Sequence, residues 1–141
     1  MGIFIEETNM KKLLKVLVCF WTFPQEFLGG LLVLYLSGKK TFIKIGNNHY
    51  MVYMVPKLFH SAISLGSYVV LDARVSFSEN TIKHEFGHSK QSLILGWLYL
   101  QVIGIPSLIR NVYSRIFKKN ADWYYAHFPE NWADKLGGVD R

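Results

Sequence analysis

The hydrophobic positions near the start of the chain form two runs. Leu13 to Phe23 is apolar after a basic start, and Phe27 to Leu36 is apolar again, but Pro24-Gln25-Glu26 interrupts them. Read together, residues 13–36 could span a bilayer with a polar defect near the middle. Read apart, each half is too short to span and suits a helix in the interface or in the core, which is what we expect. The first run has no small-residue cleavage site after it, unlike a signal peptide.

Three segments in the middle of the chain have the composition of β-strands. Thr41–Ile45 and His49–Val55 are rich in β-branched and aromatic residues, and Gly46-Asn47-Asn48 between them tolerates positive φ. This pattern predicts a hairpin. Tyr68–Leu71 predicts a third strand, so we expect an α+β fold with a small antiparallel sheet.

A long helical pattern follows the third strand. It begins near Ser78, with Ser76 or Ser78 as the N-cap, and its apolar periodicity continues until Gly104-Ile105-Pro106 breaks it. Residues 93–109 are hydrophobic all round, so this stretch either spans a membrane or is a buried or re-entrant segment.

Length and charge restrict the class of protein. The 141 residues predict one domain, 1–141, whose residues 1–37 form an apolar N-terminal segment. The formal charge is +6 and the pI about 9.4. Basic residues stand beside apolar stretches, at Lys11, Lys12, Lys15, Lys39, Lys40, Arg110, Arg115, Lys118 and Lys119. This arrangement favours an anionic membrane surface over nucleic acid, and it predicts a membrane-associated protein at the inner membrane or its cytoplasmic face.

The only cysteine, Cys19, excludes an internal disulfide framework and zinc-finger spacing. We expect it to be a small buried hydrophobic residue. His49 and His60 have no partner pattern, so we interpret both as structural.

The residues His84-Glu85-Phe86-Gly87-His88 form an HExxH motif. Positions i and i+4 share one face of a helix, so both imidazoles can reach one ion while Glu85 flanks it. Neutral imidazoles suit zinc, and a catalytic zinc keeps three protein ligands and one open position. Glu85 is the candidate general base, which takes a proton from metal-bound water and later passes it to the leaving amine.

A third ligand must come from elsewhere in the chain. Glu130 would supply it from a later helix, and Asp134, one turn on, could accept a hydrogen bond from a ligating imidazole. If residues 93–109 crossed a bilayer, His84 and Glu130 would emerge on opposite sides and could not share an ion. We therefore expect a buried or re-entrant segment that turns at Gly104 to Pro106.

These motifs resemble those of the gluzincin metallopeptidases, in which a downstream helix with ExxxD or ExxAD completes an HExxH site. Thermolysin-like enzymes and the membrane-bound prenyl-protein and heat-shock peptidases belong to this group. Longer stretches are also similar to small uncharacterised bacterial proteins and to metallopeptidase-like domains of polymorphic toxins. The resemblance covers roughly residues 67–141 and rests on residues 84–92, 95–100, 104–108 and 128–138. It implies a zincin-like fold with zinc bound by His84, His88 and Glu130, but none of the additional substrate-binding parts of those enzymes is recognisable.

The resemblance also implies where a substrate lies. In those families the strand before the HExxH helix is the sheet edge along which an extended peptide binds, so Tyr68, Val69, Val70 and Leu71 form the candidate edge, an ordinary core strand being the alternative. A metallopeptidase needs a further donor for the developing oxyanion, and Tyr124, Tyr125 or His127 could serve. His127 is also an alternative third ligand in place of Glu130.

The sequence therefore predicts a membrane-associated zinc endopeptidase that acts on peptide or protein substrates. The alternative is a catalytically silent, zinc-stabilised interaction or toxin-partner module with the same fold.

Overall fold

A computed structural model describes the backbone of residues 2–141 and the side chains of residues 9–141. The fold is α+β, as expected, with helices α1 (Gly2–Trp21), α2 (Phe23–Tyr35), α3 (Glu79–Leu95), α4 (Ile105–Ile116), α5 (Ala121–Tyr125) and α6 (Glu130–Gly137). Its strands are β1 (Lys39–Ile45), β2 (Asn48–Val55), β3 (Ala62–Leu65) and β4 (Tyr68–Asp72). The predicted hairpin is β1 and β2, and Gly46 at its turn has a φ of +58°.

The four strands form a mixed sheet, so the prediction of an antiparallel sheet is wrong. The order is β1-β2-β4-β3, with β4 parallel to β2 and antiparallel to β3. The difference arises from β3, a four-residue strand that the sequence pattern did not reveal. Because β3 pairs with β4 across the turn at Gly66, β4 returns into the sheet beside β2 in the parallel sense.

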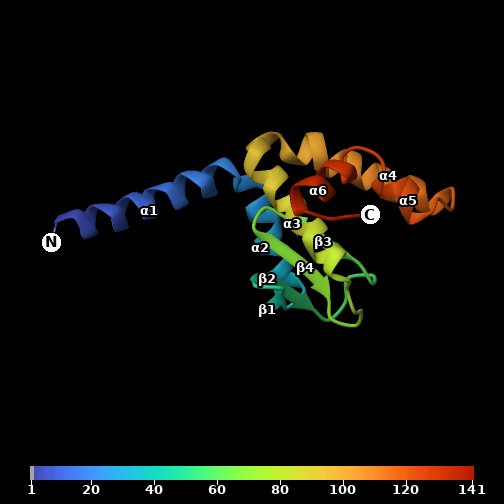
Figure 1. The fold of residues 1–141 in the computed structure, drawn as a ribbon, viewed down its shortest axis with the longest axis horizontal. Coiled ribbons are helices and arrows are strands. Elements are labelled where there is room, and N and C mark those ends of the chain that lie inside the picture. Colours follow the sequence, from blue (N-terminus) through green and yellow to red (C-terminus); the bar gives the residue numbers. More distant parts are fainter. Residues whose placement is uncertain (1) are drawn as a thin grey trace.

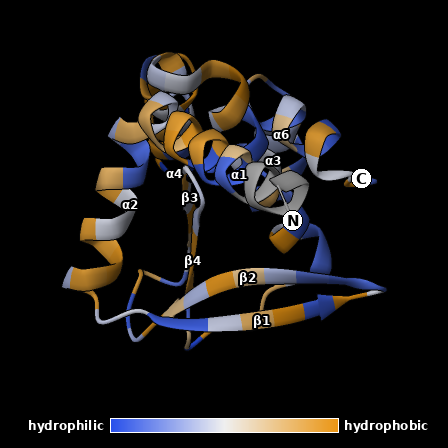
Figure 2. Ribbon diagram, turned by 90° about the vertical axis from the view of Figure 1, so that its left-hand side faces the viewer, coloured by the Kyte–Doolittle hydropathy of each residue, from blue (hydrophilic) through white to orange (hydrophobic). Residues whose placement is uncertain are grey.

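The strand β4 lies inside the sheet, which corrects the prediction that Tyr68 to Leu71 form an edge. Its Val69, Val70 and Leu71 are at most 1% exposed because helices cover both faces of the sheet. Val69 and Leu71 pack with Ile82 of α3, whereas Val70 packs with Val33 of α2. Figure 2 shows these two helices on opposite sides of β4.

The N-terminal runs form two helices that meet at a bend of 86°. One face of α2 packs in the core through Gln25, Gly29 and Val33. By contrast, every side chain of α1 from Asn9 to Trp21 is exposed, and α1 extends away from the rest of the molecule (Figure 1). Core packing is therefore wrong for α1, and Cys19, expected to be buried, is exposed.

The chain also breaks after α3, but at Gly96 and not at Gly104 to Pro106. Gly96 has a φ of +53°, and a Cβ there would lie 2.1 Å from the Trp21 ring. The helical segments Glu79–Leu98 and Leu100–Ile116 differ in direction by 120°, so the sharp bend lies at Tyr99, three residues after Gly96. Pro106 lies at the start of α4, directly after the π-helical turn Leu100–Gly104, and the helical segment Leu100–Ile116 continues through it. Only part of 93–109 is buried, notably Tyr99 and Ile103, while Leu93, Ile94, Trp97 and Leu98 are exposed.

Within the described residues, no one helix has both the length and the apolar character needed to cross a bilayer. Two bent pairs of helices are together long and apolar enough. One pair is Asn9–Trp21 with Phe23–Tyr35, and the other is Glu79–Leu98 with Leu100–Ile116.

The helices α3 and α6 approach so closely that their backbones touch. A Cβ on Gly87 would lie 1.9 Å from the carbonyl oxygen of Ala133, and a Cβ on Gly137 would lie 2.2 Å from that of Lys83. Real Cβ atoms do not come this close to backbone, so both glycines are required for the crossing. Gly87, which lies inside the HExxH motif, thus allows α6 to pack directly against α3.

We expect Gly87→Ala to lower the free energy of unfolding by about 1–3 kcal/mol or more, because the added methyl group must push two backbones apart. Gly30→Ala is the matched control: its Cβ would meet Tyr68 at 3.5 Å, an ordinary contact, and alanine favours the helix by about 0.5–1 kcal/mol. Thermal unfolding of both variants checks this. Equal stability of the two would contradict the close crossing of α3 and α6.

Candidate metal centre

The helix α3 carries the HExxH residues on its inner side. It begins after Ser78, whose hydroxyl accepts a hydrogen bond from the Thr81 backbone N–H at 3.1 Å, so Ser78 is the N-cap. His84, Glu85, His88 and Gln91 follow on this helix and are all buried. The helix thus presents both imidazoles to the interior of the domain.

The helix α6 supplies the acidic residues. Glu130 is the first residue of α6 and is fully buried, and Asp134 lies one turn later at 8% exposure. The αL residue Gly138 (φ +70°) ends the helix. Because α3 and α6 cross at Gly87 and Gly137, both carboxylates lie against the imidazoles of α3.

Three ligand atoms converge between the two helices. His84 Nε2 lies 3.0 Å from Glu130 Oε2, His88 Nε2 lies 3.1 Å from the same oxygen, and the two Nε2 atoms are 3.1 Å apart. Ligand atoms held about 2.0–2.1 Å from one tetrahedral ion are about 3.3 Å apart. The triangle therefore fits a single metal ion, and this His-His-Glu group is the one cluster of three or more such residues among residues 9–141.

The outer nitrogen of each imidazole fixes its tautomer. His84 Nδ1 lies 2.7 Å from Asp134 Oδ1, and His88 Nδ1 lies 2.7 Å from Gln91 Oε1. The Gln91 amide nitrogen in turn donates to the Pro129 carbonyl at 3.1 Å, which orients the amide. A carboxylate and an amide oxygen can only accept, so both Nδ1 atoms carry the proton.

When both imidazoles are neutral, the inner atoms of the triangle have no proton to share. In the neutral imidazoles both Nε2 atoms present lone pairs, and they face a carboxylate oxygen that also presents lone pairs. Three acceptors within 3.1 Å of one another repel unless a cation lies between them. The structure thus contains a buried site with the chemistry of a metal ligand set.

Glu130 is held in its charged form. Burial alone would raise its pKa, but the imidazoles of His84 and His88, when they are protonated in the absence of a metal ion, and the Ser107 hydroxyl hold the pKa of this carboxyl well below its usual range. Ser107 Oγ of α4 donates to Glu130 Oε1 at 2.5 Å, leaving Oε2 for the imidazoles. The carboxylate is therefore oriented from both sides.

Glu85 lies beside the triangle without belonging to it. It is 8% exposed and forms no hydrogen bond or ion pair with any residue that the structure describes. Burial raises the pKa of its carboxyl, while the nearby imidazoles of His84 and His88 act in the opposite direction. An unpartnered carboxylate with a raised pKa is suited to accept a proton.

The three aromatic candidates occupy different places. The Tyr124 side chain contacts Ser107, Asn111 and Glu130, and burial raises the pKa of its phenol. The Tyr125 ring lies edge-on to His84, with centroids 5.0 Å apart. His127 is exposed, and its Nδ1 donates to the Trp123 carbonyl at 2.7 Å, so the alternative of His127 as third ligand is wrong.

Three residues of the site were missed from the sequence. Gln91 could have been found, because it lies three positions after His88 on the same helical face. Ser107 and Arg141 could not, since they reach the site through tertiary contacts. Arg141 Nε donates to Asp134 Oδ2 at 2.8 Å, and its guanidinium lies 3.5 Å from the centre of the Tyr125 ring.

No family model matches the chain, and neither a curated protein nor a solved structure does. The interpretation of the site therefore rests on its geometry.

We expect Gln91→Met to weaken binding of Zn²⁺, used as the probe ion, by about 10–100-fold, because His88 loses the acceptor that fixes its ring. Gln101→Met is the matched control, since Gln101 is exposed. Competition titration with a chromogenic chelator gives the two affinities. Equal affinities would show that Gln91 does not orient His88.

Proposed function

We propose that the protein is a zinc-dependent metallopeptidase with a zincin-like domain. The observation that supports this most directly is the convergence of His84 Nε2, His88 Nε2 and Glu130 Oε2, three lone-pair atoms within 3.1 Å of one another. Two neutral imidazoles and one carboxylate form a ligand set that zinc accepts in hydrolases, and three protein ligands leave a position open.

The remaining chemistry falls to residues of this chain. Zinc bound there would lower the pKa of its water and polarise a substrate carbonyl. Glu85 takes the water proton and later delivers it to the leaving amine. Its freedom from other hydrogen bonds and the burial that raises its pKa both favour this role.

Peptide substrate would bind at β3 in place of the predicted β4. The strand β3 is the sheet edge next to α3, and Ser64 Oγ lies 2.9 Å from Ser89 Oγ of that helix. An extended peptide can add to such an edge by main-chain hydrogen bonds. The Tyr99 hydroxyl donates to the Ser64 carbonyl at 3.2 Å, so the stretch open to pairing lies toward Ala62.

Two phenols are placed to stabilise negative charge that develops on a substrate oxygen. Burial raises the pKa of both Tyr124 and Tyr125, so each keeps its proton at neutral pH and remains a donor. Tyr125 also lies beneath the Arg141 guanidinium, which adds a positive charge to that side of the site. His127, exposed and bonded to Trp123, is the weakest of the three candidates.

The purified protein is expected to contain about one zinc ion per chain, and His84→Ala or His88→Ala should abolish it. Removing one imidazole leaves too few ligands for a tight site. His60→Ala removes an exposed imidazole and should leave the zinc content unchanged. Elemental analysis gives the metal and its stoichiometry. Wild-type zinc content in the His84 or His88 variant would disprove the proposed site.

Glu85→Gln should retain zinc and fold while losing peptide hydrolysis by a factor of about a hundred or more, the scale of general acid-base catalysis. Glu79→Gln removes an exposed carboxylate from the same helix and serves as the matched control. Glu130→Gln should instead weaken zinc binding, because a charged ligand is lost.

The assay measures zinc content and cleavage of a peptide library by all three variants and the wild type. If the wild type binds zinc and cleaves nothing, or if Glu85→Gln cleaves at the wild-type rate, the site is a zinc-stabilised scaffold and not a peptidase.

A further inference from the structure

The molecule exposes a large apolar surface on the side away from the sheet. We call it the apolar face and define it by Leu17 and Phe20 of α1, Leu98 after α3, and Leu108, Ile109 and Ile116 of α4. Each of these six side chains is between 56% and 69% exposed. Exposed apolar surface that extends over several elements marks an interaction site, because water does not favour it.

The helix α4 exposes its apolar side, whereas a helix that packs on a core buries it. Leu108, Ile109, Val112 and Ile116 repeat at helical spacing and are exposed, whereas Ser107 points inward to Glu130. A helix with its apolar stripe outward and its polar side against the domain matches one that lies in a membrane interface.

The helix breaks within this surface have their carbonyl groups satisfied by side chains. The Trp21 indole N–H donates to the Leu93 carbonyl at 2.9 Å, and the Trp97 indole N–H donates to the Phe20 carbonyl at 2.8 Å. Gln25 Nε2 donates to the Gly96 carbonyl at 2.9 Å. On an aqueous surface water would serve these groups, but in hydrocarbon they require partners from the protein.

The charge of the chain is concentrated in the segments that carry the apolar face. Residues 8–25 and 86–121 contain eight of the sixteen Lys and Arg residues and none of the ten Asp and Glu residues. The rest of the chain consequently has two more acidic than basic residues. A positive rim around an apolar surface complements anionic lipid headgroups.

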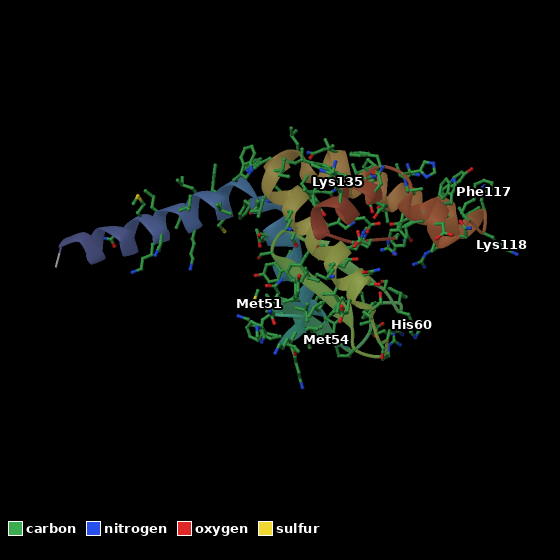
Figure 3. All side chains as sticks on the ribbon, in the orientation of Figure 1. Met51, Met54, His60, Phe117, Lys118 and Lys135 are labelled. Atoms are coloured by element: carbon green, nitrogen blue, oxygen red, sulfur yellow. The ribbon has the colours of Figure 1, made fainter. Side chains whose placement is uncertain are left out.

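We propose that the apolar face inserts into one leaflet of an anionic lipid bilayer, with α1 and α4 lying along the interface. The bend of 120° turns the chain back after Leu98, and the bend of 86° sets α2 nearly at a right angle to α1. The two indole bonds join the bends, so α1 and the end of α3 enter as one unit. Figure 3 shows Phe117 and Lys118, which follow α4, at the end of the molecule opposite α1.

Cys19 offers a direct test, because it is the only cysteine and is exposed on α1. The full chain, labelled at Cys19 with an environment-sensitive fluorophore, is mixed with phosphatidylcholine vesicles with or without phosphatidylglycerol. We expect a blue shift on anionic vesicles and quenching by brominated acyl chains. The control, Cys19→Ser/Phe42→Cys, carries the label on β1, where Phe42 is 62% exposed, and should show neither effect.

Absence of quenching at Cys19, or equal quenching at both positions, would overturn the proposal. So would a concentration-dependent dimer, measured by sedimentation without vesicles, that protects Cys19 from labelling. In that case a second copy of the chain covers the apolar face.

Two pairs of variants separate insertion from simple charge attraction. Leu108→Ser/Ile109→Ser should lower the vesicle partition coefficient about tenfold or more, whereas Phe42→Ser/Phe59→Ser, which also removes two exposed apolar side chains, should not. Replacing Arg115, Lys118 and Lys119 with Gln should weaken binding to anionic vesicles about tenfold or more, since each charge near such a surface contributes about a fivefold factor. Replacing Lys39, Lys40 and Lys44 with Gln removes three charges from β1 and is the control, which should weaken vesicle binding less. Equal losses within either pair would refute the apolar face as the lipid-binding surface.

Discussion

The contact between the backbones of α3 and α6 is the constraint on which the rest of the site depends. Gly87 and Gly137 remove the side chains that would hold the two helices apart. At this distance a carboxylate at the start of α6 reaches both imidazoles of α3, and one a turn later reaches the outer nitrogen of the first imidazole. A wider crossing would leave the same residues on the same faces without bringing their atoms together.

The close crossing creates an electrostatic cost that a bound cation offsets. Glu130 is fully buried and charged, and both imidazoles turn lone pairs toward it. Burying a carboxylate is expensive, so a bound cation would stabilise the fold. The surrounding polar groups, Asp134, Gln91 and Ser107, do not lower this cost; they fix the orientation of the three ligands.

The parts of this arrangement that depend on local periodicity were predictable from the sequence. The i,i+4 spacing placed His84 and His88 on one face, and the same argument paired Glu130 with Asp134. An N-cap at Ser76 or Ser78 followed from the side chains that favour that position, and the structure has Ser78 there. The hairpin followed from its turn residues at Gly46 to Asn48.

The predictions were wrong where tertiary contacts determine the local structure or the burial of a residue. The four-residue strand β3 carries too few residues for a period-two pattern, so its insertion beside β4, and with it the mixed sheet, was not foreseen. The helix α3 ends at Gly96, where the Trp21 ring leaves no room for a Cβ, a contact between residues 75 positions apart. Proline at 106 looked like the breaker but is compatible with a first turn. Cys19 was expected to be buried on composition, although its whole helix stands outside the core.

The hydrogen bond from Ser107 to Glu130 has a thermodynamic consequence. It joins the inner side of α4, whose outer side is apolar, directly to a ligand carboxylate. Any molecule that binds the outer side of α4 more tightly when Ser107 holds Glu130 in place must also raise the affinity of the triangle for its ion. Linkage requires the reverse effect to be of the same size. A bound ion would therefore raise the affinity of the outer side of α4 for that molecule by the same factor.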